Sequence, residues 1–129
     1  MRKQPCPRLL GALTFTIGSA FATACAFAAT HFPSGTYAAE GKTFTATFDD
    51  AGHVQVRMGS VLEVEASYAF KGEQLELTDN SGPWACTKPA EKTGTYHWKY
   101  ANGMLSFSTI DDKCKERAGS LVGQPWKKQ

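Results

Sequence analysis

The sequence lacks the signature motifs of the common enzyme classes. Its 129 residues contain no G-x-S-x-G motif, no phosphate-binding loop and no nucleophile with a neighbouring base. The three histidines, His31, His53 and His97, have neither H-E-x-x-H nor any paired spacing. His53 and His97 alternate with polar residues, so we expect solvated histidines rather than metal ligands. We therefore expect no catalytic residue, no bound metal and no cofactor.

The N-terminus has the pattern of an export signal. Basic residues precede an apolar stretch over 9–24, and Ala26-Phe27-Ala28 then fits the A-x-A cleavage rule. The apolar stretch falls short of the roughly 20 apolar residues that a membrane span needs. We predict that residues 1–28 are a cleaved signal peptide, which would send the chain to the periplasm or the exterior.

A second reading of the same segment is lipidation. Ala22-Thr23-Ala24-Cys25 resembles a lipoprotein cleavage site, with the signal ending at residue 24 and Cys25 as the acylated residue. The sequence leaves both readings open. Membrane association is expected only if Cys25 carries a lipid.

Little net charge remains once the leader is removed. Loss of Arg2, Lys3 and Arg8 leaves 11 of the 14 basic residues against 12 acidic ones, so the formal charge falls from +2 to −1. This balance does not favour a nucleic-acid partner or an anionic membrane surface. The remaining chain of about 100 residues can form one small core, which a covalent cross-link would help to stabilise.

Cysteine is scarce. Cys6 and Cys25 belong to the leader, so the mature chain keeps only Cys86 and Cys114. An exported pair without a third thiol predicts one disulfide, worth about 3–4 kcal/mol by loop closure. A redox-active pair is the alternative, but there is no C-x-x-C motif and no thioredoxin-like βαβ pattern.

From Gly35 onward, apolar residues recur with a period of two. The segment 61–70 is typical: Leu62, Val64 and Ala66 share one face with two aromatic residues, and Glu63 and Glu65 fall on the other. Turn residues such as Asn102-Gly103 separate these segments. The pattern predicts seven strands, with an eighth in the segment 121–128: 36–40, 42–49, 53–58, 61–70, 73–79, 94–100 and 103–110.

Two hairpins repeat each other. Segments 68–79 and 96–112 share Tyr-x-aromatic, a glycine turn, an apolar pair and an aspartate, about 28 residues apart, as in a meander. No segment predicts a helix long enough to cover the apolar sheet face, so the sheet must close on itself. We predict an all-β fold: an antiparallel up-and-down meander over 35–129, closing into a small eight-stranded barrel, with one short helical turn near 113–119 and a flexible arm over 29–34.

Residues at both ends of this domain resemble the lipocalin-like (calycin) barrels. Those barrels open with Gly-x-Trp and place a C-terminal basic side chain across the aromatic ring; this chain has Gly35-Thr36-Tyr37 and Arg117. The resemblance implies that Gly35, Tyr37, Arg117 and Trp126 close the barrel, with the stem of Arg117 over Tyr37 or Trp126.

Further motifs resemble a group of small exported bacterial lipocalin-like proteins whose function is not settled. The resemblance covers residues 35–126 and implies a fold rather than an activity, so no catalytic residue is carried over. The motifs are Leu75-x-Leu77-Thr78-Asp79, Gly94-Thr95-Tyr96-His97-Trp98, Asp111-Asp112-x-Cys114-x-x-Arg117, Leu121 and Pro125-Trp126.

The segment "TIDDKCKER" (109–117) gathers carboxylates, a thiol and basic side chains, as a reactive site would. We favour a structural corner, in which Cys114 tethers the segment to the 80–93 loop and Asp111 or Asp112 caps the helical turn. A metal site would need a free thiol, and export favours its oxidation.

The inward face of the strands is the best candidate for a binding site. An eight-stranded barrel is just wide enough to be filled by side chains or to hold one small ligand, and both readings stay open. Trp84 is a candidate lid over one barrel mouth, or a plug packed on the disulfide. The pattern also directs Val54, Met58, Leu62, Val64, Leu75, Leu77 and Leu105 inward. The candidate ligand-binding residues are Phe44, Phe48, Val56, Tyr68, Phe70, Tyr96, Trp98, Tyr100 and Phe107.

We therefore expect an exported, non-catalytic barrel that binds a small apolar or amphipathic ligand. The alternative is a periplasmic interaction module, such as a protease inhibitor, because small exported inhibitors of extracellular metalloproteases resemble compact eight-stranded barrels. Such a module would bind a periplasmic or extracellular protein through the arm at 29–34. Whether this arm lies on the barrel or projects from it distinguishes the two.

Overall fold

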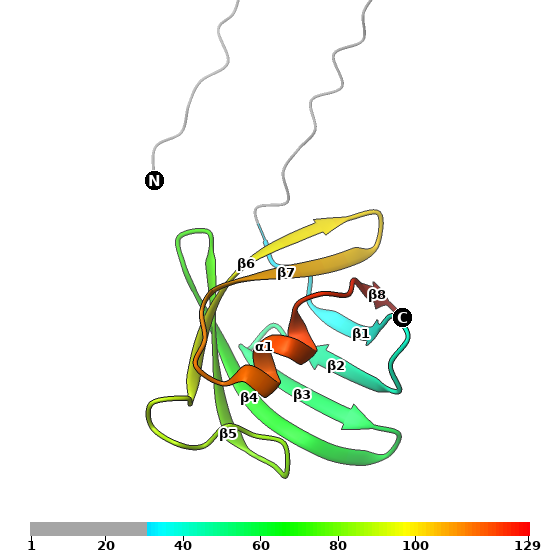
Figure 1. Cartoon of the computed structure of the whole chain (residues 1–129). Coiled ribbons are helices and arrows are strands. Elements are labelled where there is room, and N and C mark those ends of the chain that lie inside the picture. Colours follow the sequence, from blue (N-terminus) through cyan, green and yellow to red (C-terminus); the bar gives the residue numbers. More distant parts are fainter. Residues whose placement is uncertain (1–30) are drawn as a thin grey trace, which may run out of the picture.

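The computed structural model describes residues 31–129, which form a closed antiparallel barrel (Figure 1). The predicted signal peptide, the lipidation site at Cys25 and the start of the arm lie outside the described residues. Each strand pairs with the next in sequence, and β8 returns to pair with β1. The predicted up-and-down barrel and its short helix are confirmed. The elements are β1 (Gly35–Ala39), β2 (Phe44–Phe48), β3 (His53–Met58), β4 (Val61–Lys71), β5 (Gln74–Ser81), β6 (Thr93–Ala101), β7 (Met104–Asp111), α1 (Lys115–Leu121) and β8 (Trp126–Lys128).

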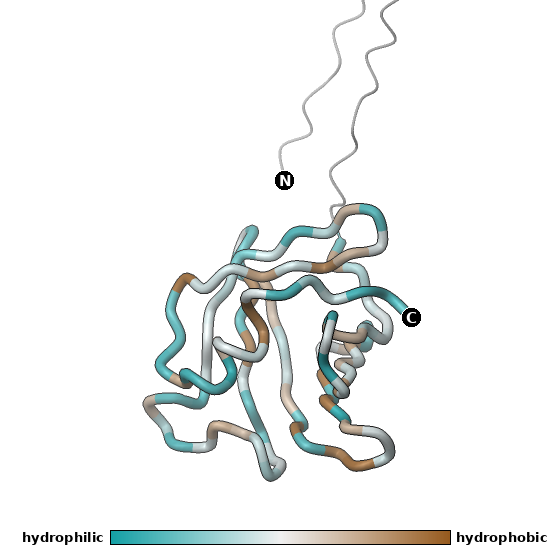
Figure 2. The backbone as a smooth tube through the Cα atoms, turned by 45° about the vertical axis from the view of Figure 1, so that its right-hand side comes forward, coloured by the Kyte–Doolittle hydropathy of each residue, from teal (hydrophilic) through white to brown (hydrophobic). Residues whose placement is uncertain are grey.

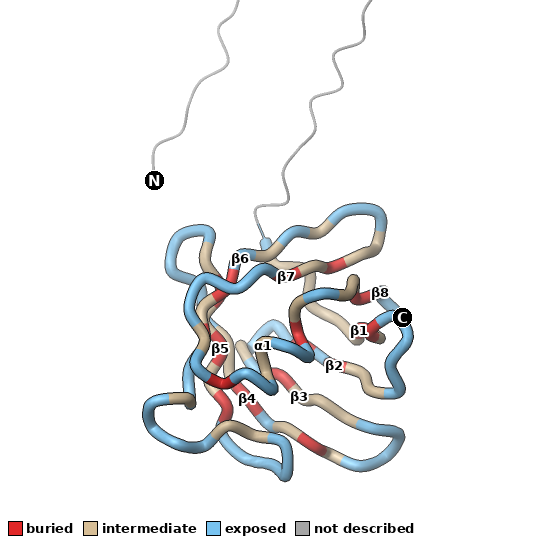
Figure 3. Tube along the Cα trace, in the orientation of Figure 1, coloured by how far each residue is buried: buried red, intermediate tan, exposed pale blue. Residues whose placement is uncertain are grey.

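Alternation along the strands builds the core. On β5, Leu75, Leu77 and Asp79 are buried while the residues between them are partly exposed. Figure 2 shows hydrophilic and hydrophobic residues mixed along the strands, and Figure 3 shows buried segments spread around the barrel. The buried apolar core consists of Tyr37, Ala39, Ala46, Phe48, Val54, Ala66, Leu75, Leu77, Tyr96, Leu105, Phe107, Leu121 and Trp126.

The β6–β7 hairpin has the turn that its sequence predicts. Asn102 and Gly103 both have positive φ, at 54° and 75°. Two left-handed residues match the right-handed twist of paired strands, and Asn and Gly adopt this conformation most readily. The local sequence therefore sets the register of this hairpin.

One bulge changes the face of a charged residue. The β3–β4 register shifts after Val56, so Arg57 pairs with Leu62 and Glu63 has no partner in the ladder. The alternating pattern predicted a solvated Glu63, but this residue is only 7% exposed. The segment after β5 covers it: the Trp84 amide donates to the Glu63 carbonyl, and a Cβ on Gly82 would lie 2.2 Å from that same oxygen.

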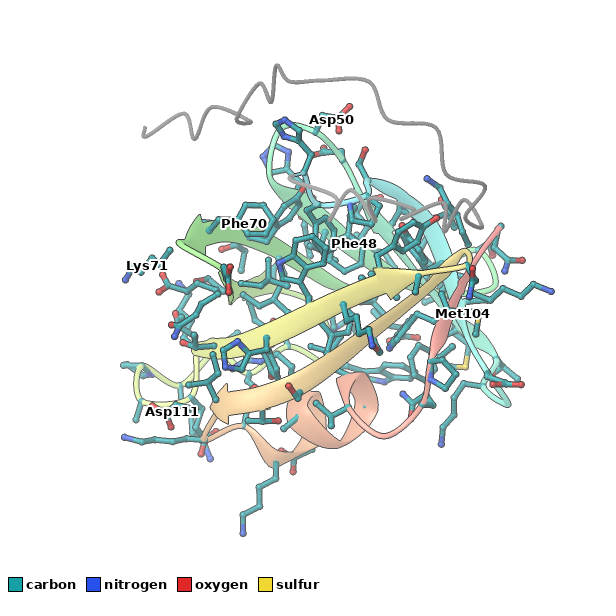
Figure 4. All side chains as sticks on the ribbon, turned by 90° about the horizontal axis from the view of Figure 1, so that it is seen from above. Phe48, Asp50, Phe70, Lys71, Met104 and Asp111 are labelled. Carbon is teal, nitrogen blue, oxygen red and sulfur yellow. A yellow bond between two sulfur atoms is a disulfide. The ribbon has the colours of Figure 1, made fainter. Side chains whose placement is uncertain are left out.

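One end of the barrel is closed by the residues that precede β1. The Phe32 ring lies 5.0–5.6 Å, between centroids, from the rings of Phe48, Tyr68, Phe70 and Trp98. Figure 4 looks onto this side of the barrel, with Phe48 and Phe70 labelled. We call these five residues the aromatic plug.

The plug corrects one prediction. Residues 31–34 were expected to belong to a flexible arm, but Phe32 is packed in the plug and the Tyr37 hydroxyl donates to the Pro33 carbonyl. The physical reason is that an apolar ring next to an open barrel end gains by leaving water. The residues before 31 are not described.

Truncation of the plug tests this closure. Phe32→Ala should lower the free energy of unfolding by about 2 kcal/mol, less than the about 3–5 kcal/mol of a fully buried Phe, because Phe32 is only partly buried. His31→Ala, at the exposed neighbouring position, is the matched control and should stay within about 0.5 kcal/mol. Chemical denaturation measures both. Equal stability of the two variants would show that Phe32 does not close the barrel.

Candidate functional site

A cavity of about 550 Å³ lies inside the barrel, between the sheet and the segments that cover it. Strands β2 to β5 supply an apolar wall, while the loop after β5 and helix α1 supply the opposite side. Its apolar wall residues on the strands are Phe44, Ala46, Phe48, Val54, Val56, Val64, Ala66 and Leu77, with Trp126 on β8. Its charged residues are Asp79, Lys88, Glu91, Glu116 and Arg117.

The predicted disulfide between Cys86 and Cys114 is present. It joins the loop after β5 and helix α1, which together cover the cavity and are called the cover below. It links the loop after β5 to the N-cap of α1, with 6.2 Å between the two Cα atoms. The Cys114 Sγ also accepts a hydrogen bond from the Arg117 amide at the start of the helix. Glu116 lies near both sulfur atoms, but bonded sulfurs do not offer thiolate ligands. These contacts describe a structural corner.

Arg117 is the most highly connected side chain of the site. Its Nε and Nη2 donate to the two Asp112 carboxylate oxygens at 2.8 and 2.7 Å. Nη2 also donates to the Glu91 carbonyl at 2.8 Å, and Nη1 to the Lys92 carbonyl at 2.9 Å. Nη1 also lies 3.1 Å from Asp79 Oδ2, an ion-pair contact that adds to these four hydrogen bonds. The Arg117 side chain is 9% exposed, so this guanidinium is buried and satisfied.

The Asp112 carboxylate that pairs with this guanidinium has further hydrogen-bond partners. It also accepts hydrogen bonds from the Tyr96 hydroxyl and from the Cys114 amide. Strand β6 passes so close that a Cβ on Gly94 would lie 2.4 Å from Asp112 Oδ2. Only glycine leaves room for the carboxylate there.

The network holds Asp112 and Arg117 in their charged forms. Burial disfavours ionisation of Asp112, but hydrogen bonds from Arg117, Tyr96 and the Cys114 amide keep its pKa below the usual value. Burial also opposes the charge of Arg117, yet its bonds to Asp112 and the charge of Asp79 raise its pKa. Burial, and then the hydrogen bond to Asp112, raise the pKa of Tyr96, which therefore stays a neutral donor.

The structure corrects the roles predicted for the C-terminal corner. Cys114, rather than Asp111 or Asp112, is the N-cap of α1. The Arg117 guanidinium lies between two carboxylates, and the cation near the Tyr37 ring is Lys128, with Nζ 6.0 Å from the centroid. A guanidinium gains more from paired carboxylates than from an aromatic face.

The other predicted closing residues lie where β1 and β8 meet. The Trp126 indole donates to the Leu121 carbonyl at 3.0 Å, which ties the closing strand to the end of α1. Gly35 has a φ of +136°, and a Cβ there would lie 2.9 Å from the Lys128 side chain. Glycine is therefore required at this position by the backbone conformation, since the end of the flexible Lys128 side chain can move aside.

The nine predicted ligand-binding residues divide among three regions. Phe44, Phe48 and Val56 line the cavity. Tyr68, Phe70 and Trp98 belong with Phe48 to the aromatic plug, where Phe70 is 44% exposed. Tyr96, Tyr100 and Phe107 pack elsewhere in the core, and each ring centroid lies within 6.5 Å of that of another aromatic ring.

Trp84 lines the cavity at its covered side and is 46% exposed. Its ring meets Phe44 edge-on, with centroids 6.0 Å apart. Its role as a lid or as a plug stays a prediction.

Sequence analysis missed the main polar residue of the cavity. Asp79 is 3% exposed and lines the cavity together with Leu77. The signal was available, because Asp79 alternates in phase with Leu75 and Leu77 on β5. Sequence analysis placed Ala66 on the apolar face but named neither Ala66 nor Ala46 as a binding residue, and both line the cavity with small side chains.

Comparison with protein-family models, curated proteins and solved structures finds no match to this chain. The eight-stranded antiparallel barrel is consistent with a lipocalin-like fold. No helix among residues 31–129 is long and apolar enough to cross a membrane. The function is therefore argued from the residues of the cavity themselves.

The buried ion pair yields a stability prediction. Arg117→Ala leaves two carboxylates buried without their cation and should cost about 3–5 kcal/mol of unfolding free energy. Arg57→Ala is the matched control: its side chain bonds a surface carbonyl and Gln55, so its loss should cost less than about 1 kcal/mol. Urea denaturation measures both, and a small effect at Arg117 would contradict the central role given to it.

Proposed function

We propose that this protein is a non-catalytic carrier that holds one small apolar or amphipathic molecule in the cavity beneath α1 and Trp84. The observation that carries the proposal is the cavity itself, whose strand walls are apolar and whose charged residues gather at the covered side. Ligand sites typically have volumes of about 300–1,000 Å³, with apolar walls and a few placed polar groups.

The distribution of side chains supports a cavity rather than a filled core. The aromatic residues that fill one half of the barrel are concentrated around Phe32. In the other half, the wall includes Ala46 and Ala66, whose side chains are single methyl groups and do not fill the interior. A barrel of eight strands holds one small ligand when its interior is not filled in this way.

The charged residues of the cavity support binding rather than turnover. Arg117 and Asp112 are fixed by mutual hydrogen bonds, and Asp79 holds both Arg117 and the Cys86 amide. Groups committed to such contacts position the cover of the cavity. A reactive role would require a nucleophile or a base that is free to move a proton.

The proposal includes export. The Cys86–Cys114 disulfide fits an oxidising compartment, and the leader pattern over 1–28 points the same way. We propose a periplasmic or secreted protein of lipocalin-like type, with anchoring through a lipid on Cys25 as the alternative.

The inhibitor reading receives less support. It needs the residues before β1 to project toward a partner, whereas Phe32 is packed in the aromatic plug and Pro33 accepts from Tyr37. A bound inhibitor arm of this kind would first have to leave the barrel.

Filling the cavity tests the proposal. Ala66→Phe places a ring in the space that the ligand would occupy, so it should weaken binding of the neutral probe N-phenyl-1-naphthylamine at least about tenfold. Ala69→Phe, at an exposed position on the same strand, is the matched control and should bind like the wild type. Fluorescence titration measures binding, and thermal unfolding verifies that both variants are folded.

Equal binding by the two variants would place the probe outside the cavity and contradict the proposal. Mass spectrometry of small molecules released from protein purified from its host would identify the natural ligand class.

A further inference from the structure

We infer that the cavity selects an amphipathic ligand with a cationic, hydrogen-donating head group, such as a primary ammonium, and discriminates against a carboxylate head. The inference rests on the proposed carrier function and adds the chemical class of the ligand. It follows from which polar atoms of the cavity are already used and which remain open.

Arg117 is the obvious partner for an anionic head group, but its charge is already paired with the carboxylates of Asp79 and Asp112. Its guanidinium donates four hydrogen bonds, to both oxygens of Asp112 and to the carbonyls of Glu91 and Lys92, and Nη1 also lies 3.1 Å from Asp79 Oδ2. A ligand carboxylate would have to displace one of these acceptors and leave it unpaired. The cost of a buried unpaired acceptor offsets the gain of the new bond.

Asp79 offers the opposite chemistry. Its Oδ2 lies 3.1 Å from Arg117 Nη1 and accepts from the Cys86 amide at 2.8 Å, whereas Oδ1 takes no hydrogen bond in the part of the chain that the structure describes. Every fully buried side-chain oxygen of these residues has a hydrogen-bond partner. Since Oδ1 has none, it must keep some accessible surface. Because Asp79 is only 3% exposed and lines the cavity, we infer that Oδ1 faces the cavity. One carboxylate oxygen is thus available to a donor.

The charge balance favours the same ligand. Around the ion pair, Asp79 and Asp112 face the single cation of Arg117, which leaves one formal negative charge. At the cover, Glu91 and Glu116 outnumber Lys88, whose Nζ already lies 3.9 Å from Glu91. The charged side of the cavity is therefore net negative, and low-dielectric walls strengthen its attraction for a cation.

The apolar wall residues determine which chemistry suits the part of the ligand beyond its head group. Phe44, Val54 and Val56 lie on the strands away from the charged side, so they suit a hydrocarbon body. An ammonium group next to Asp79 Oδ1 would donate a hydrogen bond to this oxygen without disturbing the contacts of Arg117. The ligand that fits is one apolar chain or ring system with a single amine.

A series of three probes with the same chain tests the inference without any mutation. Dodecylammonium, dodecanol and dodecanoate, each below its micelle concentration, compete with N-phenyl-1-naphthylamine for the wild-type protein. Dodecylammonium should bind at least about tenfold more tightly than dodecanoate, with dodecanol between them. Dodecanoate binding as tightly as dodecylammonium, or more tightly, would overturn the inference.

Two variants locate the preference at Asp79. Asp79→Asn should reduce the ratio of dodecylammonium to dodecanol affinity to near one. Glu76→Gln removes the same charge from a position on the same strand that does not line the cavity and should keep the ratio. Dodecanol affinity in each variant reports whether the cavity is intact. An unchanged ratio in Asp79→Asn would contradict the assignment.

The outcomes separate the two proposals. Binding of dodecanol without a preference for the ammonium head would refute the selectivity and leave the carrier function standing. Failure of all three probes to displace N-phenyl-1-naphthylamine would refute the selectivity, and the absence of binding by every apolar probe, N-phenyl-1-naphthylamine included, would refute both proposals.

Discussion

The structure depends on one buried guanidinium. Arg117 joins the short helix to Asp79 on β5, to Asp112 after β7 and to the two carbonyls that precede β6. A guanidinium with this little exposure is tolerated because it donates four hydrogen bonds and pairs with two carboxylates, from β5 and from the segment after β7. The disulfide at Cys114 adds a covalent link at the same place. Helix α1 has only seven residues, and these contacts rather than helix propensity keep it over the barrel.

The same constraint creates the cavity. Because Arg117 and the disulfide hold the cover by its polar side, the cover need not sink onto the apolar strand wall. The opposite barrel end is closed differently, by the aromatic plug around Phe32. One half of the interior is thus filled by rings, while the other keeps its space beneath α1, with Asp79 as the buried polar residue at its edge. A carrier needs both the closed end and the remaining space, since a barrel open at two ends would not retain a ligand.

Much of the fold was predictable because it depends on local patterns. Period-two alternation, glycine turns and the isolated cysteine pair predicted the eight strands, their order and the disulfide. The misses arise from contacts that no local pattern encodes. Glu63 is buried because a bulge and the Gly82 segment meet over it, Phe32 is packed because an open end receives it, and Arg117 turns to Asp79 and Asp112 instead of an aromatic ring. Asp79 alternates in phase with the buried Leu75 and Leu77, but its ion-pair partner Arg117 lies 38 positions later in the sequence.

The most direct test of the account is a titration of the methyl-labelled protein with N-phenyl-1-naphthylamine, followed by NMR. Val54, Val56 and Val64 line the cavity, whereas Val61, 54% exposed at the β3–β4 turn, does not. The account predicts saturable shifts at the three cavity valines with one probe bound, and none at Val61. Shifts confined to Val61, or no saturable shift at the cavity valines, would contradict the claim that this barrel holds its ligand beneath α1.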